Sequence, residues 1–361
     1  MNPSMPEQPR LVTGGVDTHA DFHVAAVVDE VGRVLGTEKF PASINGYKAL
    51  LSWVTSHGQL TKVGIEGTGS YGAGLARYMA TAGTEVVEVI RPNRQARRRR
   101  GKSDVTDAVA AALAALNGEA SGTPKSHDGA VEAIRALRVA RSGAIKARTQ
   151  AANQLRDLVL TAPEALRQDF AGLPTESRVA KAARLRPGPL LGPLEGAKAA
   201  LASVARRYQE LSAEIDRLDA ALDELVDRTA PEDFLAKLGV GTRVTAALLV
   251  TVGDNPGRLK SDRSFAALCG ASPVDASSGK QVRHRLNRGG DRQANSALWR
   301  IVMTRLAHKD SRTQAYVERR TKEGKTTKEI MRCLKRYVAR EVYKSLVAPA
   351  LGQERATLVA A

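Results

Sequence analysis

The chain has 361 residues, 43% of them hydrophobic and 26% charged, which is enough for two or three globular domains with a sizeable core. Lys and Arg outnumber Asp and Glu by 55 to 38, so the formal net charge is +17 and a polyanionic partner such as nucleic acid is favoured. Without a long apolar run or a signal segment, we expect no membrane association. Two isolated cysteines argue against a disulfide framework and predict a cytoplasmic location.

Residues 11–125 are predicted to form a mixed α/β domain, after a polar leader at residues 1–10 that we expect to be disordered. Strand-like alternation separated by turn formers predicts hairpin-linked strands at residues 11–16, 22–28 and 34–40. Helices and strands then alternate, at residues 47–56, 62–66, 71–82 and 85–90. This order is that of a ribonuclease-H-like fold, but the pattern alone does not single that fold out.

The pattern becomes helical from residue 126, and residues 126–230 are predicted to form a coiled-coil domain. A helix at 127–160 is followed by a proline-rich connection at 161–195. Apolar residues then recur at spacings of four and three over three heptads, from Val204 to Leu225. Such a seam needs a partner, either the 127–160 helix folded back or a second subunit; a plain globular bundle is the alternative.

Residues 231–346 are predicted to form a mostly helical C-terminal domain, followed by a tail at 347–361. The segment 236–254 resembles a helix-hairpin-helix, in which Gly239 and Gly241 let backbone amides approach a phosphate. A simple helical turn has the same pattern. Basic helices are expected at residues 293–307, 313–323 and 327–346.

Four acids have positions that suggest chemistry. Asp17 and Glu66 each end a predicted strand, while Asp104 and Asp107 lie one turn apart at the start of an Ala-rich helix. Capping alone explains the helical pair, but an unpaired charge at the end of a buried strand is costly. If the four carboxylates converge, their oxygens suit Mg²⁺ or Mn²⁺, and two such ions promote phosphoryl transfer.

Two histidines follow the first acid. His19 and His23 lie two and six positions after Asp17, and this even spacing predicts that all three share one face of a strand. Because the sequence offers no matching His or Cys partners, we interpret both histidines as structural groups or as supports of the acids.

A basic run directly precedes the helical aspartates. Seven of the twelve residues 91–102 are Lys or Arg, and none is acidic. A charge run is usually a solvated surface. Next to a phosphoryl-transfer site, we interpret it as a nucleic-acid clamp; its members are Arg94, Arg97, Arg98, Arg99, Arg100 and Lys102.

Residues 268–300 combine small hydroxyls with a dense basic segment. Ser277, Ser278 and Gly279 form a turn, which the basic residues follow: Lys280, Arg283, Arg285, Arg288 and Arg292. Such residues fit phosphate contact, and a hydroxyl among cations also fits a nucleophile for a phosphodiester. His284 has no partner that would identify it as a base. The residues alone therefore leave passive binding and catalysis both open.

Four motifs in this order resemble the DEDD transposases of insertion sequences, a family that includes Piv-type invertases and bridge-RNA-guided recombinases. They are Asp17-Thr-His, Glu66-Gly-Thr-Gly-Ser-Tyr-Gly72, Lys102-Ser-Asp104-Val-Thr-Asp107-Ala, and Gly270-x-x-Pro273 followed by Ser278-Gly279. The resemblance covers roughly residues 14–346. It implies a RuvC-like domain, a coiled coil and a serine-bearing transposase domain in a bacterial, nucleoid-associated protein.

The resemblance also implies a site. Asp17, Glu66, Asp104 and Asp107 would be the divalent-metal ligands. Ser278 would attack DNA and hold a covalent intermediate, with Ser277 as the alternative nucleophile. Acids of one subunit would act with the serine of another in a dimer or tetramer. A structured noncoding RNA would pair with donor and target DNA and supply the sequence specificity.

Three other functions fit parts of the sequence. A RuvC-like nuclease would cut with metal-activated water, and Ser278 would only bind phosphate. A sugar kinase or related ATPase is suggested by Asp17-Thr18 and Gly67-Thr68-Gly69, but the net charge and the lack of a second Gly-rich half weigh against it. A purely structural nucleic-acid-binding protein leaves the four acids unexplained.

Overall fold

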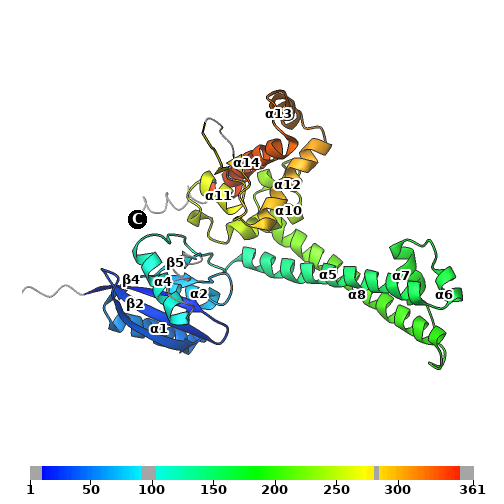
Figure 1. The fold of residues 1–361 in the computed structure, drawn as a ribbon, viewed down its shortest axis with the longest axis horizontal. Coiled ribbons are helices and arrows are strands. Elements are labelled where there is room, and N and C mark those ends of the chain that lie inside the picture. Colours follow the sequence, from blue (N-terminus) through cyan, green and yellow to red (C-terminus); the bar gives the residue numbers. More distant parts are fainter. Residues whose placement is uncertain (1–9, 91–102, 280–283, 350–361) are drawn as a thin grey trace, which may run out of the picture. The chain divides into compact units, whose positions relative to one another are not determined.

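The computed structural model describes residues 10–90, 103–279 and 284–349 (Figure 1). These residues fall into two compact units. The first contains the described residues up to Gly129 together with Gly253–Lys260, and the second contains Ala130–Val252 and Ser261–Pro349. The expected leader, apart from Arg10, and most of the expected tail lie outside the described residues.

A five-stranded sheet in the order β3-β2-β1-β4-β5 forms the centre of the first unit. The strands are β1 (Leu11–Thr18), β2 (Phe22–Asp29), β3 (Val34–Pro41), β4 (Gln59–Glu66) and β5 (Glu85–Val89). The first three strands pair antiparallel, whereas β4 runs parallel to β1 and β5 parallel to β4. The predicted mixed α/β organisation is confirmed, and every predicted strand is present.

Helices cover both faces of this sheet. One face packs against α1 (Ile44–Ser56) and α2 (Ala73–Thr81) through a core that includes Val16, Leu50 and Leu75. The other face packs against α4 (Asp104–Leu116). Two glycines allow this second contact to be close, because a Cβ at Gly15 or Gly64 would lie 2.1 Å or 2.5 Å from the α4 backbone. The α4 helix therefore rests directly on the strands β1 and β4.

Two long helices dominate part of the second unit, α5 (Ala130–Thr161) and α8 (Pro193–Thr229) (Figure 1). They pack along each other in antiparallel directions. Arg141 pairs with Asp219, whereas the later Gln154 pairs with the earlier Arg207. The predicted seam on α8 thus has its partner within the same chain; the coiled-coil assignment itself stays a prediction.

The proline-rich connection between α5 and α8, residues 161–195, contains two short helices that were not predicted, α6 (Glu164–Asp169) and α7 (Thr175–Ala183). Pro163 and Pro174 are the residues before these helices, and α8 begins at Pro193. Proline is well tolerated at a helix start, because the amide there has no partner within the helix. These prolines therefore begin helices instead of excluding them.

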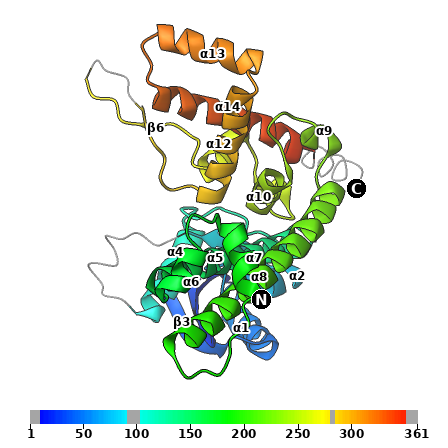
Figure 2. The same ribbon diagram turned by 90° about the vertical axis from the view of Figure 1, so that its right-hand side faces the viewer.

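The remainder of the second unit is mostly helical, as predicted. It contains α9 (Glu232–Leu235), α10 (Thr242–Val252), α11 (Asp262–Leu268), α12 (Arg292–Ala307), α13 (Ser311–Lys322) and α14 (Thr327–Leu346). The antiparallel strands β6 (Val274–Asp275) and β7 (His284–Arg285) form a short hairpin that was not predicted (Figure 2). The 3-10 helix η1 (Pro256–Arg258) belongs to the first unit. Among the described residues, no helix has the length and apolar character needed to cross a membrane.

Candidate functional site

The sheet brings two of the four predicted acids next to each other. Val16 of β1 pairs with Ile65 of β4 in parallel register, so the residues that follow, Asp17 and Glu66, occupy adjacent positions. Alternation along each strand puts Asp17 on the face of Gly15 and Glu66 on the face of Gly64, which is the face that α4 covers. Both carboxylates therefore belong to the α4 side of the sheet.

The other two acids lie in the first turn of α4. Ser103 begins this helix by accepting a hydrogen bond from the backbone amide of Thr106. Asp107 is only 3% exposed. The ligand atoms of Asp17, His19 and Asp104 all lie within 4.8 Å of one another. The contact of α4 with the sheet thus brings its first turn to the end of β1.

The electrostatics of Asp17 reflect this crowding. Burial raises the pKa of the Asp17 carboxyl above its ordinary value, and His19 opposes this effect. The charges of Asp107 and Asp104 raise the pKa of Asp17 further. Mutually repelling carboxylates at one place are the ligand set that a hard divalent cation neutralises. The donor set therefore fits Mg²⁺ or Mn²⁺.

His19 belongs to this cluster, in agreement with one of its two predicted roles, a support of the acids. Its Nε2 atom lies 3.2 Å from Asp17 Oδ2 and 3.5 Å from Asp104 Oδ2. Its position two residues after Asp17 was the only signal, and it did not distinguish a structural role from a place beside the acids. The imidazole bridges the strand acid and the helix acid.

The predicted placement of His23 on the same face is wrong. β1 ends at Thr18 and the chain reverses, so His23 lies on β2, where it pairs with Thr18 and not with Asp17. Its ring is fully buried and stacks on Tyr47 at 5.6 Å between centroids. Burial lowers the pKa of His23 below its ordinary value. His23 is therefore a core residue on the opposite face of the sheet.

The two candidate serines lie in the hairpin between β6 and β7, in the second unit. The Asp275 carboxylate accepts hydrogen bonds from the Ser277 amide at 2.8 Å and from the Ser277 hydroxyl at 2.5 Å. These bonds, the hydroxyl's first, lower the pKa of Asp275 below its ordinary value. Ser278 is exposed, and its hydroxyl makes no hydrogen bond to another described residue. The Ser277 hydroxyl is therefore held by Asp275, whereas no described residue holds the Ser278 hydroxyl.

The predicted nucleic-acid-binding residues are described in part. Arg285, Arg288 and Arg292 are exposed. Gly239 has a φ of 87°, and a Cβ there would lie 3.0 Å from the Ile301 carbonyl, so it serves packing against α12. A Cβ at Gly241 would meet nothing within 4 Å, which leaves its backbone open. The remaining ones lie outside the described residues: Arg94, Arg97, Arg98, Arg99, Arg100, Lys102, Lys280 and Arg283.

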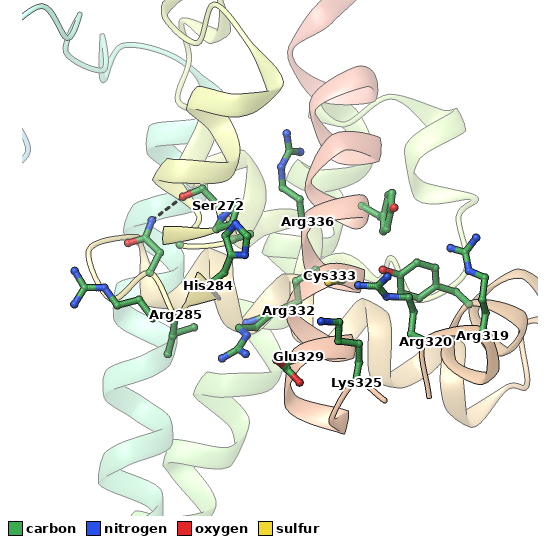
Figure 3. Close-up of a pocket in the computed structure, with 18 residues that line it drawn as sticks. Ser272, His284, Arg285, Arg319, Arg320, Lys325, Glu329, Arg332, Cys333 and Arg336 are labelled. Atoms are coloured by element: carbon green, nitrogen blue, oxygen red, sulfur yellow. Dashed lines mark hydrogen bonds between the residues drawn. The ribbon is translucent and has the colours of Figure 1, made fainter. Parts of the chain in front are cut away.

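The sequence also missed a basic pocket in the second unit. It has a volume of about 400 Å³ and lies between the ends of the serine hairpin and the helices α13 and α14 (Figure 3). The signal was present only as basic residues on two predicted helices. Their periodicity does not say which faces meet.

Comparison with known proteins gives consistent matches for both units. Residues 14–162, which contain the four acids, match a DEDD-type family described as transposase. Residues 235–318, which contain both serines, match the transposase IS116/IS110/IS902 family. Together these regions cover more than half of the chain. The chain is also similar to an uncharacterized 43.6 kDa protein of insertion element IS110 from Streptomyces coelicolor, at 29% identity over 125 residues. That alignment spans 34% of this chain and 30% of the relative.

Proposed function

Because the chain belongs to the IS110-type family of DEDD transposases, we propose that it cuts the DNA of an insertion sequence and rejoins it elsewhere. The observation that carries this proposal is the gathering of Asp17, Asp104 and Asp107 at the strand ends, in a chain of net charge +17. The order of three antiparallel strands followed by two parallel ones supports a RuvC-like, ribonuclease-H-like domain at residues 11–125. The coiled coil is assigned to 126–230 and the transposase domain to 231–346.

The four acids are proposed to hold Mg²⁺ or Mn²⁺. Asp17 and Glu66 supply oxygens from adjacent strands, and Asp104 and Asp107 supply them from the first turn of α4. The Nε2 atom of His19 lies 3.2 Å from Asp17 and 3.5 Å from Asp104, beside both carboxylates. Divalent ions bound there would stabilise the charge that develops on the attacking and leaving oxygens.

Ser278 is the proposed nucleophile. Its hydroxyl oxygen forms a bond to the phosphorus of a DNA phosphodiester, and the bond from that phosphorus to one sugar oxygen breaks. The departing sugar oxygen takes up a proton, and the serine hydroxyl gives one up. Attack by a sugar hydroxyl of another strand then releases Ser278 and rejoins the DNA. The engagement of the Ser277 hydroxyl by Asp275 favours Ser278 over its neighbour.

The proposal includes two partners besides donor and target DNA. A structured noncoding RNA transcribed from the element supplies sequence specificity by base pairing, and the protein contributes phosphate contacts. The protein also associates with itself, as a dimer or tetramer. Co-expression with the flanking DNA, stringent purification and sequencing of bound RNA tests the first point. A discrete RNA that matches the junction and the insertion site is expected, and random host RNA alone contradicts RNA guidance.

Trapping of the covalent intermediate tests the chemistry. Labelled element-end DNA is incubated with the protein, its RNA and Mg²⁺, and adducts that survive denaturing electrophoresis are counted. The wild type and Ser277→Ala are expected to form an adduct, while Ser278→Ala and Asp17→Asn are expected to form none. The alternative, a RuvC-like nuclease, predicts that Ser278→Ala still cuts the DNA and that no variant forms an adduct.

A further inference from the structure

The basic pocket is formed by segments of the second unit that are far apart in sequence. Residues 270–273 and 284–287, which lead into and out of the serine hairpin, line one side, and α13 and α14 line the other (Figure 3). Seven lining residues are Lys or Arg, and Glu329 is the one described acid among them. The Glu329 carboxylate already caps its own helix, because it accepts hydrogen bonds from the amide and the hydroxyl of Thr326. The positive charge of the pocket is therefore not neutralised from within the described lining.

Lys335 of α14 is the lining residue that indicates an anionic ligand most directly. It is 7% exposed, and its ammonium donates to the neutral side-chain oxygen of Asn295 at 2.8 Å. No described acid forms an ion pair with Lys335, and its charged neighbour is Arg332. Burial, and secondarily Arg332, lower the pKa of Lys335 below its ordinary value. A buried ammonium without a counter-charge is costly, so a core role alone does not explain it.

Two arginines of the pocket have buried donors in excess of their partners. Arg336 forms an ion pair with Asp262 through Nη2 at 2.8 Å, but its buried Nη1 has no acceptor among the described residues. Arg320 pairs with Glu323, and its buried Nε likewise has no described acceptor. An oxyanion with several acceptor oxygens satisfies such donors better than water or a single carboxylate.

We propose that the basic pocket binds a phosphate of the DNA strand that the serine hairpin engages. Phosphate oxygens would accept from Lys335 and from the free donors of Arg336 and Arg320. The pocket volume of about 400 Å³ also has room for an attached sugar. At one edge Tyr337 is 46% exposed and meets Tyr316 edge-on at 5.3 Å, which offers a surface for a base.

The position of the pocket favours DNA over RNA as the strand. The pocket is lined by the two segments that carry the hairpin, so a phosphate held there lies on the strand presented to Ser278. A flanking phosphate held in this way would position the phosphodiester to be cut. This inference rests on the proposed function for the identity of the strand, but the binding of phosphate does not require the serine chemistry.

The test is the salt dependence of DNA binding by the full-length protein. Binding to a labelled duplex of arbitrary sequence is measured by fluorescence anisotropy between low and physiological salt for the wild type and Lys335→Met. The substitution keeps the length of the side chain and removes one buried charge. We expect an affinity loss of about tenfold at low salt and a salt slope that is smaller by about one. Lys328→Met, on an exposed part of the same helix, is the control and should change affinity less than about twofold.

Two further measurements separate the outcomes. Unchanged affinity and slope in Lys335→Met would overturn the proposal, whatever the Tm of the variant. If Lys335→Met loses affinity only for a structured RNA probe of equal length and not for DNA, the pocket is an RNA site, and the proposal is also overturned. The Ser278→Ala variant is assayed separately for the covalent adduct. If it still forms that adduct, the serine mechanism is wrong while the result for the pocket stands.

Discussion

Substitution of Asp17 by Asn should stabilise the protein in the absence of metal. The Asp17 residue is 9% exposed, and a ligand oxygen of Asp104 lies within 4.8 Å of one of the Asp17 carboxylate oxygens. At an effective dielectric constant of about 20, two unit charges at that separation repel by about 3 kcal/mol. The Asp104 side chain is 43% exposed, so solvent screening reduces this to about 1 kcal/mol.

Buried Asp107 and the burial of Asp17 itself add to this penalty, and the loss of the attraction to His19 offsets part of it. The net gain for Asp17→Asn is then about 1–2 kcal/mol, or a rise of about 3–8 °C in Tm. The sign follows from the raised pKa of Asp17. Its ionised form is disfavoured in the folded state, so the penalty is absent at low pH and grows as pH rises through the folded pKa. The advantage of the variant should therefore be present at neutral pH and shrink in acid.

Thermal unfolding in EDTA measures the repulsion between the carboxylates, and thermal unfolding in saturating Mn²⁺ measures its relief by a cation. Mn²⁺ at about 100 times its Kd should stabilise the wild type by about 2.7 kcal/mol, and Asp17→Asn should lose most of that gain. Asp21→Asn removes the same charge from the exposed turn of the same hairpin and serves as the control. An equal or lower Tm of Asp17→Asn in EDTA would contradict the repulsion between the carboxylates. Full stabilisation of that variant by Mn²⁺ would contradict a role of Asp17 as a ligand.

Two further predictions concern the packing that holds each unit together. A Cβ at position 15 would lie 2.1 Å from a backbone nitrogen of α4, so Gly15→Ala should lower the free energy of unfolding in urea by about 3 kcal/mol. Gly69→Ala, where a Cβ meets nothing within 4 Å, should change it by less than about 0.5 kcal/mol, and equal effects would contradict this packing. Arg141→Ala should lower the free energy of unfolding by only about 1–2 kcal/mol at pH 7, because Arg243 still pairs with Asp219 in the variant. The hydrogen bond from Arg141 holds the pKa of Asp219 below its ordinary value, so this cost should vanish as pH falls below about 4, and a pH-independent cost would exclude the ion pair as its cause.

The sequence predicted those parts of the fold that depend on local pattern. Period-two alternation defined β1 to β3, and the helices α12 to α14 begin and end within two residues of their predicted bounds. The proximity of Asp17 to the acids of α4 was harder to foresee. It depends on Gly15 and Gly64, whose missing side chains let the helix approach, and a sequence pattern does not reveal where two backbones meet.

The errors have physical causes of the same kind. The helices α6 and α7 inside the proline-rich connection were not predicted, although Pro163 and Pro174 directly precede them, where a missing amide costs nothing. His23 was placed with Asp17 by counting residues, although a chain reversal lay between them. The basic pocket was missed because Lys335 and its acceptor Asn295 are 40 residues apart on different helices.

The antiparallel arrangement of α5 and α8 has a consequence for the order in which the chain folds. At the end nearest α6 and α7, contacts between α5 and α8 link residues that are closer in sequence. The Gln154–Arg207 pair, for example, closes a segment of 53 residues. Towards the other end, Arg141 and Asp219 close one of 78. The entropy lost in closing a loop rises with its length, so we expect pairing to begin at the α6–α7 end and to proceed like a zipper. On a ribosome, this hairpin can form before residues 231–349 are synthesised, and it then offers α5 as a finished surface on which α10 docks.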